Sequence, residues 1–111
     1  MIIHKELAAG RWFAFSLSEQ LANVGMDIER TIKWQNQGDL IQSRFAFERA
    51  LELLTLTIMD PKHRRRLKEL TRARELLIDH FVYDNQYQTS DESWQKYFMY
   101  FSYRAAAQRG K

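Results

Sequence analysis

The residues that most clearly suggest chemistry form a basic segment from Asp60 to Arg74, DPKHRRRLKELTRAR. From residue 61 onward it carries seven basic side chains and one acidic one, a net charge of +6, whereas the whole chain carries +3. Concentrated cations attract phosphates, and phosphate neutralisation supplies much of the affinity of proteins for nucleic acid. We therefore predict a site for nucleic acid or an acidic protein, formed by Lys62, Arg64, Arg65, Arg66, Lys68 and Arg72.

The expected positions of these cations support that interpretation. On a helix, residues 62, 65, 66 and 69 share one face and residues 64, 68 and 72 another, so the charges surround the first turns. The positive end of the helix dipole also lies there, and a bound anion would relieve both the repulsion and the dipole mismatch. The alternative is a solvated helix face, partly neutralised by carboxylates from its neighbours.

A second candidate is the pair Arg74 and His80 in RELLIDH, spaced R-x5-H. Arginine can stabilise charge that develops on phosphorus, and histidine can transfer a proton near neutral pH. The spacing resembles the R-x4–6-H pattern of HEPN domains, helical bundles of which many are dimeric, metal-independent ribonucleases. That resemblance implies a phosphate clamp at Arg74 and an acid–base at His80. Six residues of straight helix turn through about 240°, so the two would converge only across a dimer interface or at an unwound turn.

Aromatic residues are the third candidate. Trp94, Phe98 and Phe101 recur at helical spacing and predict a core stripe, which leaves other rings outside it. Tyrosine and tryptophan bury large areas with little loss of entropy and are enriched at interfaces. We assign self-association to Trp12, Phe13, Tyr97, Tyr100 and Tyr103. Partial burial within the chain and stacking on nucleobases are the alternatives, and the GRWFAF segment is expected to pack across the bundle or against another copy.

Other catalytic and cofactor signatures are missing from the sequence. The histidines His4, His63 and His80 stand apart, without HExxH spacing, and there is no cysteine, Gly-rich phosphate loop or nucleophile elbow. We therefore expect no metal, cofactor or small-molecule substrate, and more generally no enzyme. The lack of cysteine is typical of a reducing cytosol. The longest apolar run, LLTLTIM, is far shorter than the roughly 20 residues that span a bilayer, so we expect a cytoplasmic protein without a membrane partner.

The elements that must position these residues are predicted to be helices. Hydrophobic residues make up 45% of the chain, while one proline and four glycines leave few turns for an all-β fold. Apolar residues recur in steps of three and four in four segments, which predicts helices at about 16–37, 39–59, 61–83 and 90–108.

The helix starts carry their own signals. Capping-box patterns are predicted at Ser16–Glu19, Asp39–Gln42 and Thr89–Glu92, and Pro61 suits the first turn of the third helix. Similar lengths and short connections predict an all-α, up-down-up-down four-helix bundle over residues 16–111, with a short N-terminal extension at residues 1–15.

Several stretches resemble those of a family of short, uncharacterised prokaryotic all-helical proteins: LSEQLANVG, ERTIKW, AFERALELLTLTI and DPKHRRRLKEL. The likeness extends over residues 11–103. That family has no known activity, so the resemblance implies no functional residue. In shape alone, the predicted bundle is similar to the accessory proteins of diversity-generating retroelements, basic oligomers that bind nucleic acid, but a shared shape does not carry function.

Taken together, these features predict a non-enzymatic, homo-oligomeric helical bundle that binds nucleic acid, or an acidic protein, through its basic helix. Two alternatives remain open at this point. One is a HEPN-like, metal-independent ribonuclease. The other is a protein–protein interaction adaptor in which the basic helix serves only solubility.

Overall fold

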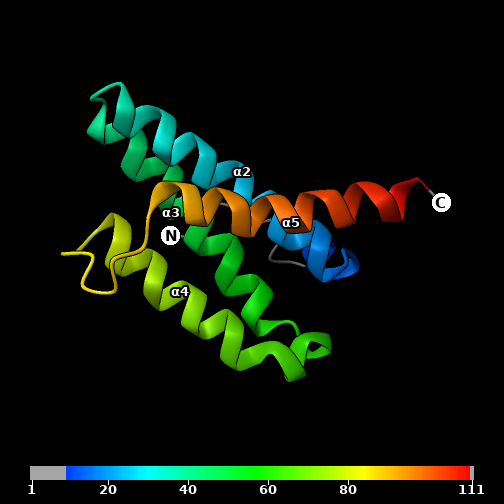
Figure 1. Ribbon diagram of the computed structural model, residues 1–111. Helices are drawn as coiled ribbons and strands as arrows, with labels where there is room; N and C mark the ends of the chain where they lie inside the picture. Colours follow the sequence, from blue (N-terminus) through cyan, green and yellow to red (C-terminus); the bar gives the residue numbers. More distant parts are fainter. Residues whose placement is uncertain (1–9, 111) are drawn as a thin grey trace.

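The structure, a computed structural model, describes residues 10–110. Its elements are η1 (Arg11–Ala14), α2 (Leu17–Asn36), α3 (Leu40–Met59), η2 (Pro61–Arg66), α4 (Leu67–Phe81) and α5 (Asp91–Arg109). The two η elements are 3-10 helices, and the described residues include no strand. Figure 1 shows that the chain direction reverses from each α-helix to the next. The predicted all-α four-helix bundle, with a short segment ahead of it, is confirmed.

The first two helix starts lie where the sequence placed them. Ser16 Oγ accepts a hydrogen bond from the Glu19 amide at 3.2 Å, and the Glu19 carboxylate accepts from the Ser16 amide at 3.0 Å. Both halves of the capping box are therefore formed. At α3, Asp39 accepts from the Gln42 amide at 3.0 Å and acts as a single-sided N-cap.

The start of α5 differs from the prediction. The N-cap is Ser90 and its reciprocal partner is Ser93, instead of Thr89 and Glu92. The shift has a physical reason, because the Thr89 hydroxyl is occupied by contacts to the side chains of the preceding loop and of α4. The loop fixes Thr89, and the next residue then caps the helix.

The third predicted helix is also different in its first turns. Residues 61–66 form the 3-10 segment η2, in which His63 has non-helical angles (φ −100°, ψ 20°), and the α-helix begins only at Leu67. Asp60 caps η2 by accepting from the Lys62 amide at 3.1 Å. Asp60 and His63 are both buried, and their inward hydrogen bonds hold the junction in a tighter winding than that of an α-helix.

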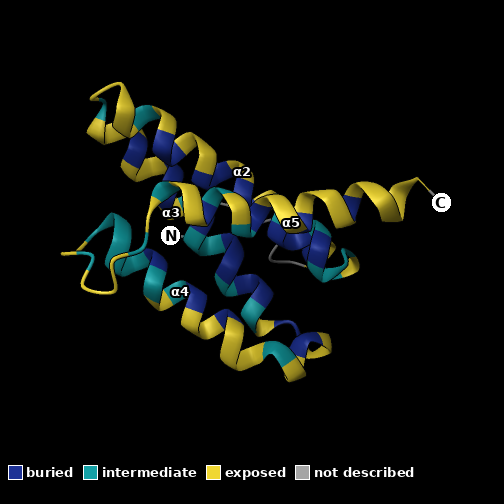
Figure 2. Ribbon diagram, viewed as in Figure 1, coloured by how far each residue is buried: buried dark blue, intermediate teal, exposed yellow. Residues whose placement is uncertain are grey.

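The core lies between the facing sides of the helices. α2 packs against α3 and α5, and α3 also packs against α4. Figure 2 shows buried residues along the sides that face one another and exposed residues along the outer sides and the C-terminal end of α5. Burial of one large apolar side chain contributes roughly 1.5–3 kcal/mol. Almost fully buried members of this core include Leu21, Val24, Ile28, Leu54, Leu70 and Leu77.

α2 and α5 approach each other closely at Gly25. A Cβ atom at this position would lie 2.6 Å from Phe98 Cβ, well inside the van der Waals contact distance. Because the obstacle is the base of the Phe98 side chain, rotation of that side chain cannot remove it. The crossing of α2 and α5 therefore depends on the missing side chain of Gly25.

The short 3-10 segment η1 packs onto the bundle through Trp12. The Trp12 ring is 1% exposed, and its Nε1 donates to Thr57 Oγ1 at 3.2 Å. Phe15 meets the same ring edge-on, with 5.7 Å between the ring centroids. Of the two arrangements expected for this segment, packing across the bundle is the one observed. The assignment of Trp12 to self-association is therefore corrected, because the core of its own chain already covers the ring.

Candidate nucleic-acid interface

All six cations assigned to the basic site lie on η2 and the first turns of α4, but they do not share one role. Lys62 folds back onto the protein. Its Nζ donates to the Asp60 carboxylate and to the Phe13 carbonyl oxygen, the latter at 2.9 Å. Lys62 therefore stabilises the junction between α3 and η2, and its charge is largely neutralised within the chain.

Arg66 is also committed to the fold. Its Nε and Nη2 donate to the two carboxylate oxygens of Glu69 at 3.0 and 2.9 Å, a two-pronged ion pair. The guanidinium group lies 5.9 Å from the centroid of the Phe101 ring on α5. The ion pairs of Lys62 with Asp60 and of Arg66 with Glu69 thus neutralise part of the basic segment, as the alternative interpretation of the sequence expected.

The remaining four cations are more available. Arg64, Arg65 and Lys68 are exposed, and no residue of the described part of the chain forms an ion pair or hydrogen bond with their side chains. Arg72 makes one loose pair, 3.8 Å from Nη1 to a carboxylate oxygen of Glu75, with both side chains more than half exposed. Such exposed pairs contribute only about 0–1 kcal/mol, so a phosphate can replace the carboxylate at little cost.

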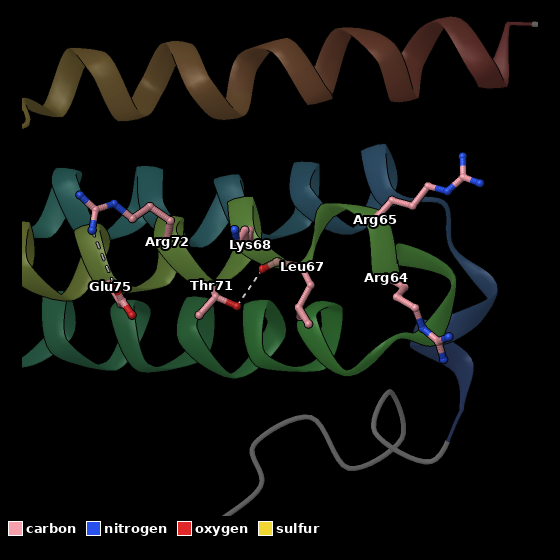
Figure 3. Close-up of a pocket in the computed structure, with 7 residues that line it drawn as sticks. All are labelled: Arg64, Arg65, Leu67, Lys68, Thr71, Arg72 and Glu75. Carbon is pink, nitrogen blue, oxygen red and sulfur yellow. Dashed lines mark hydrogen bonds and ion pairs between the residues drawn. The ribbon is translucent and has the colours of Figure 1, made fainter.

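These four cations line an open groove of about 550 Å³ along α4, together with Leu67, Thr71 and Glu75 (Figure 3). In this view Arg65 and Arg72 extend toward the side of α5, while Arg64 and Leu67 extend toward α3. Residues 65 to 72 span about 10 Å of helix axis. A strand of B-form DNA carries about three phosphates over that length, so the row of cations and a phosphate backbone have similar charge spacing.

Asp60 supplies a negative charge at the start of η2, beside the groove. Asp60 is 4% exposed and accepts hydrogen bonds from the Lys62 amide and from Gln20 Nε2, the latter at 3.0 Å. Burial raises the pKa of Asp60, but the hydrogen bonds from Lys62 and Gln20 outweigh this effect and hold the pKa below its ordinary value. The carboxylate is therefore ionised and already supplies the negative charge that the helix dipole favours. The expectation that a bound anion would relieve a dipole mismatch stays a prediction, because α4 itself begins at Leu67 and its N-cap, Arg66, makes no side-chain cap hydrogen bond.

His63 belongs to the same buried network. Gln20 Nε2 donates to Asp60 and to the Trp12 carbonyl oxygen (3.0 Å), so Gln20 Oε1 is the acceptor that faces His63 Nε2 at 2.7 Å. His63 must then carry its proton on Nε2. Burial lowers the pKa of His63, the charges of Lys62 and Arg66 lower it further, and Asp60 opposes them without reversing the shift.

This arrangement predicts a loss of stability in mild acid. Above the ordinary histidine pKa of 6.5 both folded and unfolded chains hold His63 neutral, and the stability is fully present. As the pH falls below 6.5 the unfolded chain binds the proton first, so the free energy of unfolding decreases, by at most about 1.4 kcal/mol per pH unit. Urea unfolding of the wild type and of His63→Gln across this window measures the effect. The prediction would be contradicted if the free energy of unfolding of the wild type decreased with falling pH no more steeply than that of His63→Gln.

Arg74 and His80 are not assembled into a site within the chain. Arg74 Nε donates to Thr55 Oγ1 on α3 at 3.3 Å, whereas His80 Nε2 contacts an Asp91 carboxylate oxygen at the start of α5 at 2.8 Å. α4 is a continuous α-helix over both residues. It has no unwound turn that would bring the two side chains together, and they have separate partners.

His80 instead helps to fasten the connection between α4 and α5. Its Nδ1 contacts Thr89 Oγ1 at 3.0 Å, and the same oxygen accepts from Trp94 Nε1 at 3.1 Å and lies 3.2 Å from Asn85 Oδ1. A threonine hydroxyl held by three neighbours has no free lone pair aimed at a substrate. These contacts therefore have a structural role, which is to fix the loop against α4 and α5.

The aromatic residues assigned to self-association occupy different environments. Tyr100 and Tyr103 are 55% and 71% exposed, and Phe13 is half-buried. Tyr97 is half-buried and its hydroxyl donates to a Glu69 carboxylate oxygen at 3.3 Å. Burial, followed by the nearby charge of Glu69, raises the pKa of Tyr97 well above its ordinary value, so its hydroxyl remains protonated. Tyr100 and Tyr103 are therefore the most exposed of the aromatic residues assigned to self-association.

Tyr87 is a residue of this region that the sequence did not single out. It lies in the loop between α4 and α5, and its ring centroid is 4.8 Å from the Arg72 guanidinium carbon. The ring therefore stands at one end of the groove. Its only sequence signal is an aromatic side chain within the otherwise polar stretch DNQYQTSDE.

Comparisons with known proteins give no further assignment. No protein-family model matches the chain, and no curated protein or solved structure is significantly similar to it. The resemblance to a family of prokaryotic helical proteins thus receives no support. Within residues 10–110, no cluster of three or more His, Asp or Glu side chains could hold a metal ion. None of the helices there has both the length and the apolar character needed to cross a membrane.

Proposed function

We propose that the protein is a non-enzymatic helical-bundle protein that binds nucleic acid through the groove on α4. The observation that carries the proposal is the set of four exposed cations, Arg64, Arg65, Lys68 and Arg72, of which only Arg72 has a carboxylate partner among the described residues, and a loose one. Like charges at neighbouring helix positions repel one another. A polyanion with a similar charge spacing removes that repulsion and releases its own counterions.

The surroundings of the groove favour binding over catalysis. Arg74 and His80 have separate structural partners, and Thr89 is held by its neighbours. Arg64, Arg65 and Lys68 lie beside a single aliphatic side chain, Leu67. Such a surface can position phosphates, and no histidine lies among the residues that line the groove.

We also propose that copies of the chain associate through α5. Tyr100 and Tyr103 are exposed there, and Met99 beside them is 48% exposed. Aromatic and methionine side chains are enriched where protein surfaces meet. The mass of the purified protein in solution tests this proposal, and a monomer at every accessible concentration would contradict it.

Neutralising two of the groove cations tests the proposed function. The double variant Arg65→Gln/Lys68→Gln is expected to bind a mixed-sequence oligonucleotide about tenfold more weakly at 50 mM salt, because two phosphate contacts are lost. The slope of log affinity against log salt should also become shallower, by about 1.4 for a single-stranded oligonucleotide and about 1.8 for a duplex. Fluorescence anisotropy titrations between about 50 and 200 mM salt provide both values.

The matched control is Lys33→Gln/Arg44→Gln. It removes the same net charge from two exposed positions that lie outside the groove. If the two double variants lose affinity equally, the groove has no special role and only the overall charge matters. Wild-type binding that does not weaken with salt would exclude a phosphate-based interface.

A further inference from the structure

We infer that the groove takes a single strand of nucleic acid and that Tyr87 is the platform on which one of its bases stacks. The inference rests on the proposed function and names the form of nucleic acid that the site accepts. It follows from the position of an exposed ring at the end of a row of cations.

The first argument is position. Arg72 lines the groove, and its guanidinium carbon lies 4.8 Å from the centroid of the Tyr87 ring. Arg65, Lys68 and Arg72 follow one side of α4 at helical spacing. Tyr87 therefore continues the line of the three cations beyond the end of the groove. A backbone that follows the cations brings a base to the ring.

The second argument is that the loop carrying Tyr87 is preorganised by hydrogen bonds. The Asp79 carboxylate accepts hydrogen bonds from the amides of Gln86 and Tyr87 at 3.0 and 3.1 Å. Asn85 takes a positive φ of 51° and bonds to both backbone groups of Thr89, at 2.8 and 3.0 Å. The loop is thus fixed at its start, middle and end, although the Tyr87 side chain is 56% exposed. A preformed platform loses little conformational entropy when a ligand binds.

The third argument is the chemistry of the ring and its neighbour. An aromatic ring stacks on any base, and each such contact contributes about 1–3 kcal/mol to single-strand binding. The Arg72 cation is attracted to the same ring and can still contact a phosphate. In a duplex the base faces are already stacked on one another, so the ring has no base to receive. The groove then offers a duplex only its charge.

The test uses the full chain and four labelled probes of equal length: oligothymidine, oligouridine, an abasic phosphodiester strand and a mixed-sequence duplex. Tyr87→Ala is expected to weaken binding to at least one of the two single-stranded probes about tenfold, and binding to the abasic strand and the duplex by less than twofold. Tyr87→Trp should retain the affinity because it keeps an aromatic face. Tyr83→Ala, which removes another exposed tyrosine that does not line the groove, should change none of the four.

The outcomes separate this inference from the proposed function. If Tyr87→Ala affects neither single strand, or affects the duplex and abasic strand as much, the stacking platform is wrong while the groove proposal stands. If the wild type binds none of the four probes, the proposed function itself fails. Oligothymidine represents DNA and oligouridine represents RNA. The probe whose binding is weakened more by Tyr87→Ala identifies the preferred kind of strand. The variant lies in an exposed loop, and an unchanged melting temperature confirms that its fold is intact.

Discussion

Replacing Asp60 with alanine is expected to lower the free energy of unfolding by about 3 kcal/mol, the largest effect of any single polar substitution considered. The carboxylate caps η2 and accepts from Gln20, and these are separate contributions. Loss of an N-cap costs about 0.5–2 kcal/mol, and a buried donor left without an acceptor costs about 1–3 kcal/mol. Gln20 is fully buried, so water cannot replace the lost acceptor without opening the core.

Asp39→Ala is the matched control. Asp39 is also a helix N-cap, but its side chain accepts only the capping hydrogen bond from the Gln42 amide and no hydrogen bond from a buried side chain. It should cost about 1 kcal/mol. Urea unfolding followed by far-ultraviolet circular dichroism measures both. Equal losses in the two variants would mean that the network around Asp60 adds nothing beyond capping.

Gly25→Ala is expected to destabilise the protein by about 2 kcal/mol, although alanine is normally the better helix former. The new Cβ would sit 2.6 Å from Phe98 Cβ, so α2 and α5 must move apart. Overpacking of this kind costs about 1–3 kcal/mol, and the backbone shift also loosens contacts on either side of the crossing, which outweighs the gain of up to 1 kcal/mol in helix propensity.

The control for this substitution is Gly110→Ala at the end of α5. Its φ is −74°, and an added Cβ would meet only two carbonyl oxygens at 3.5 and 3.6 Å, which are ordinary contacts. Thermal unfolding should show a lower melting temperature for Gly25→Ala than for the wild type. The melting temperature of Gly110→Ala should be almost the same as that of the wild type. A Gly25→Ala protein as stable as the wild type would show that α2 and α5 are not locked at this crossing.

The sequence predicted the helices well because their signals are local. Apolar residues at steps of three and four, together with a cap such as Ser16 with Glu19, lie within a few residues of one another. The basic segment was likewise visible as a run of charge. The existence of the helices and the concentration of cations in one segment of the chain follow from such short-range patterns.

What the sequence could not predict depends on partners distant in the chain. Lys62 bonds to the Phe13 carbonyl oxygen, 49 residues away, and His63 to Gln20, 43 residues away. These contacts decide which cations are neutralised and why η2 winds as a 3-10 helix. The role inferred for Tyr87 was hidden in the same way, because only the folded loop places its ring beside Arg72.

The spacing between α4 and α5 has a mechanical consequence. These helices are joined by extended side chains, with Tyr97 reaching Glu69 and Arg66 lying over Phe101. α2 and α5, in contrast, are interlocked at Gly25. Rotating a long side chain requires far less energy than separating two closely packed backbones. The contact between α4 and α5 therefore resists separation less than the crossing of α2 and α5 does.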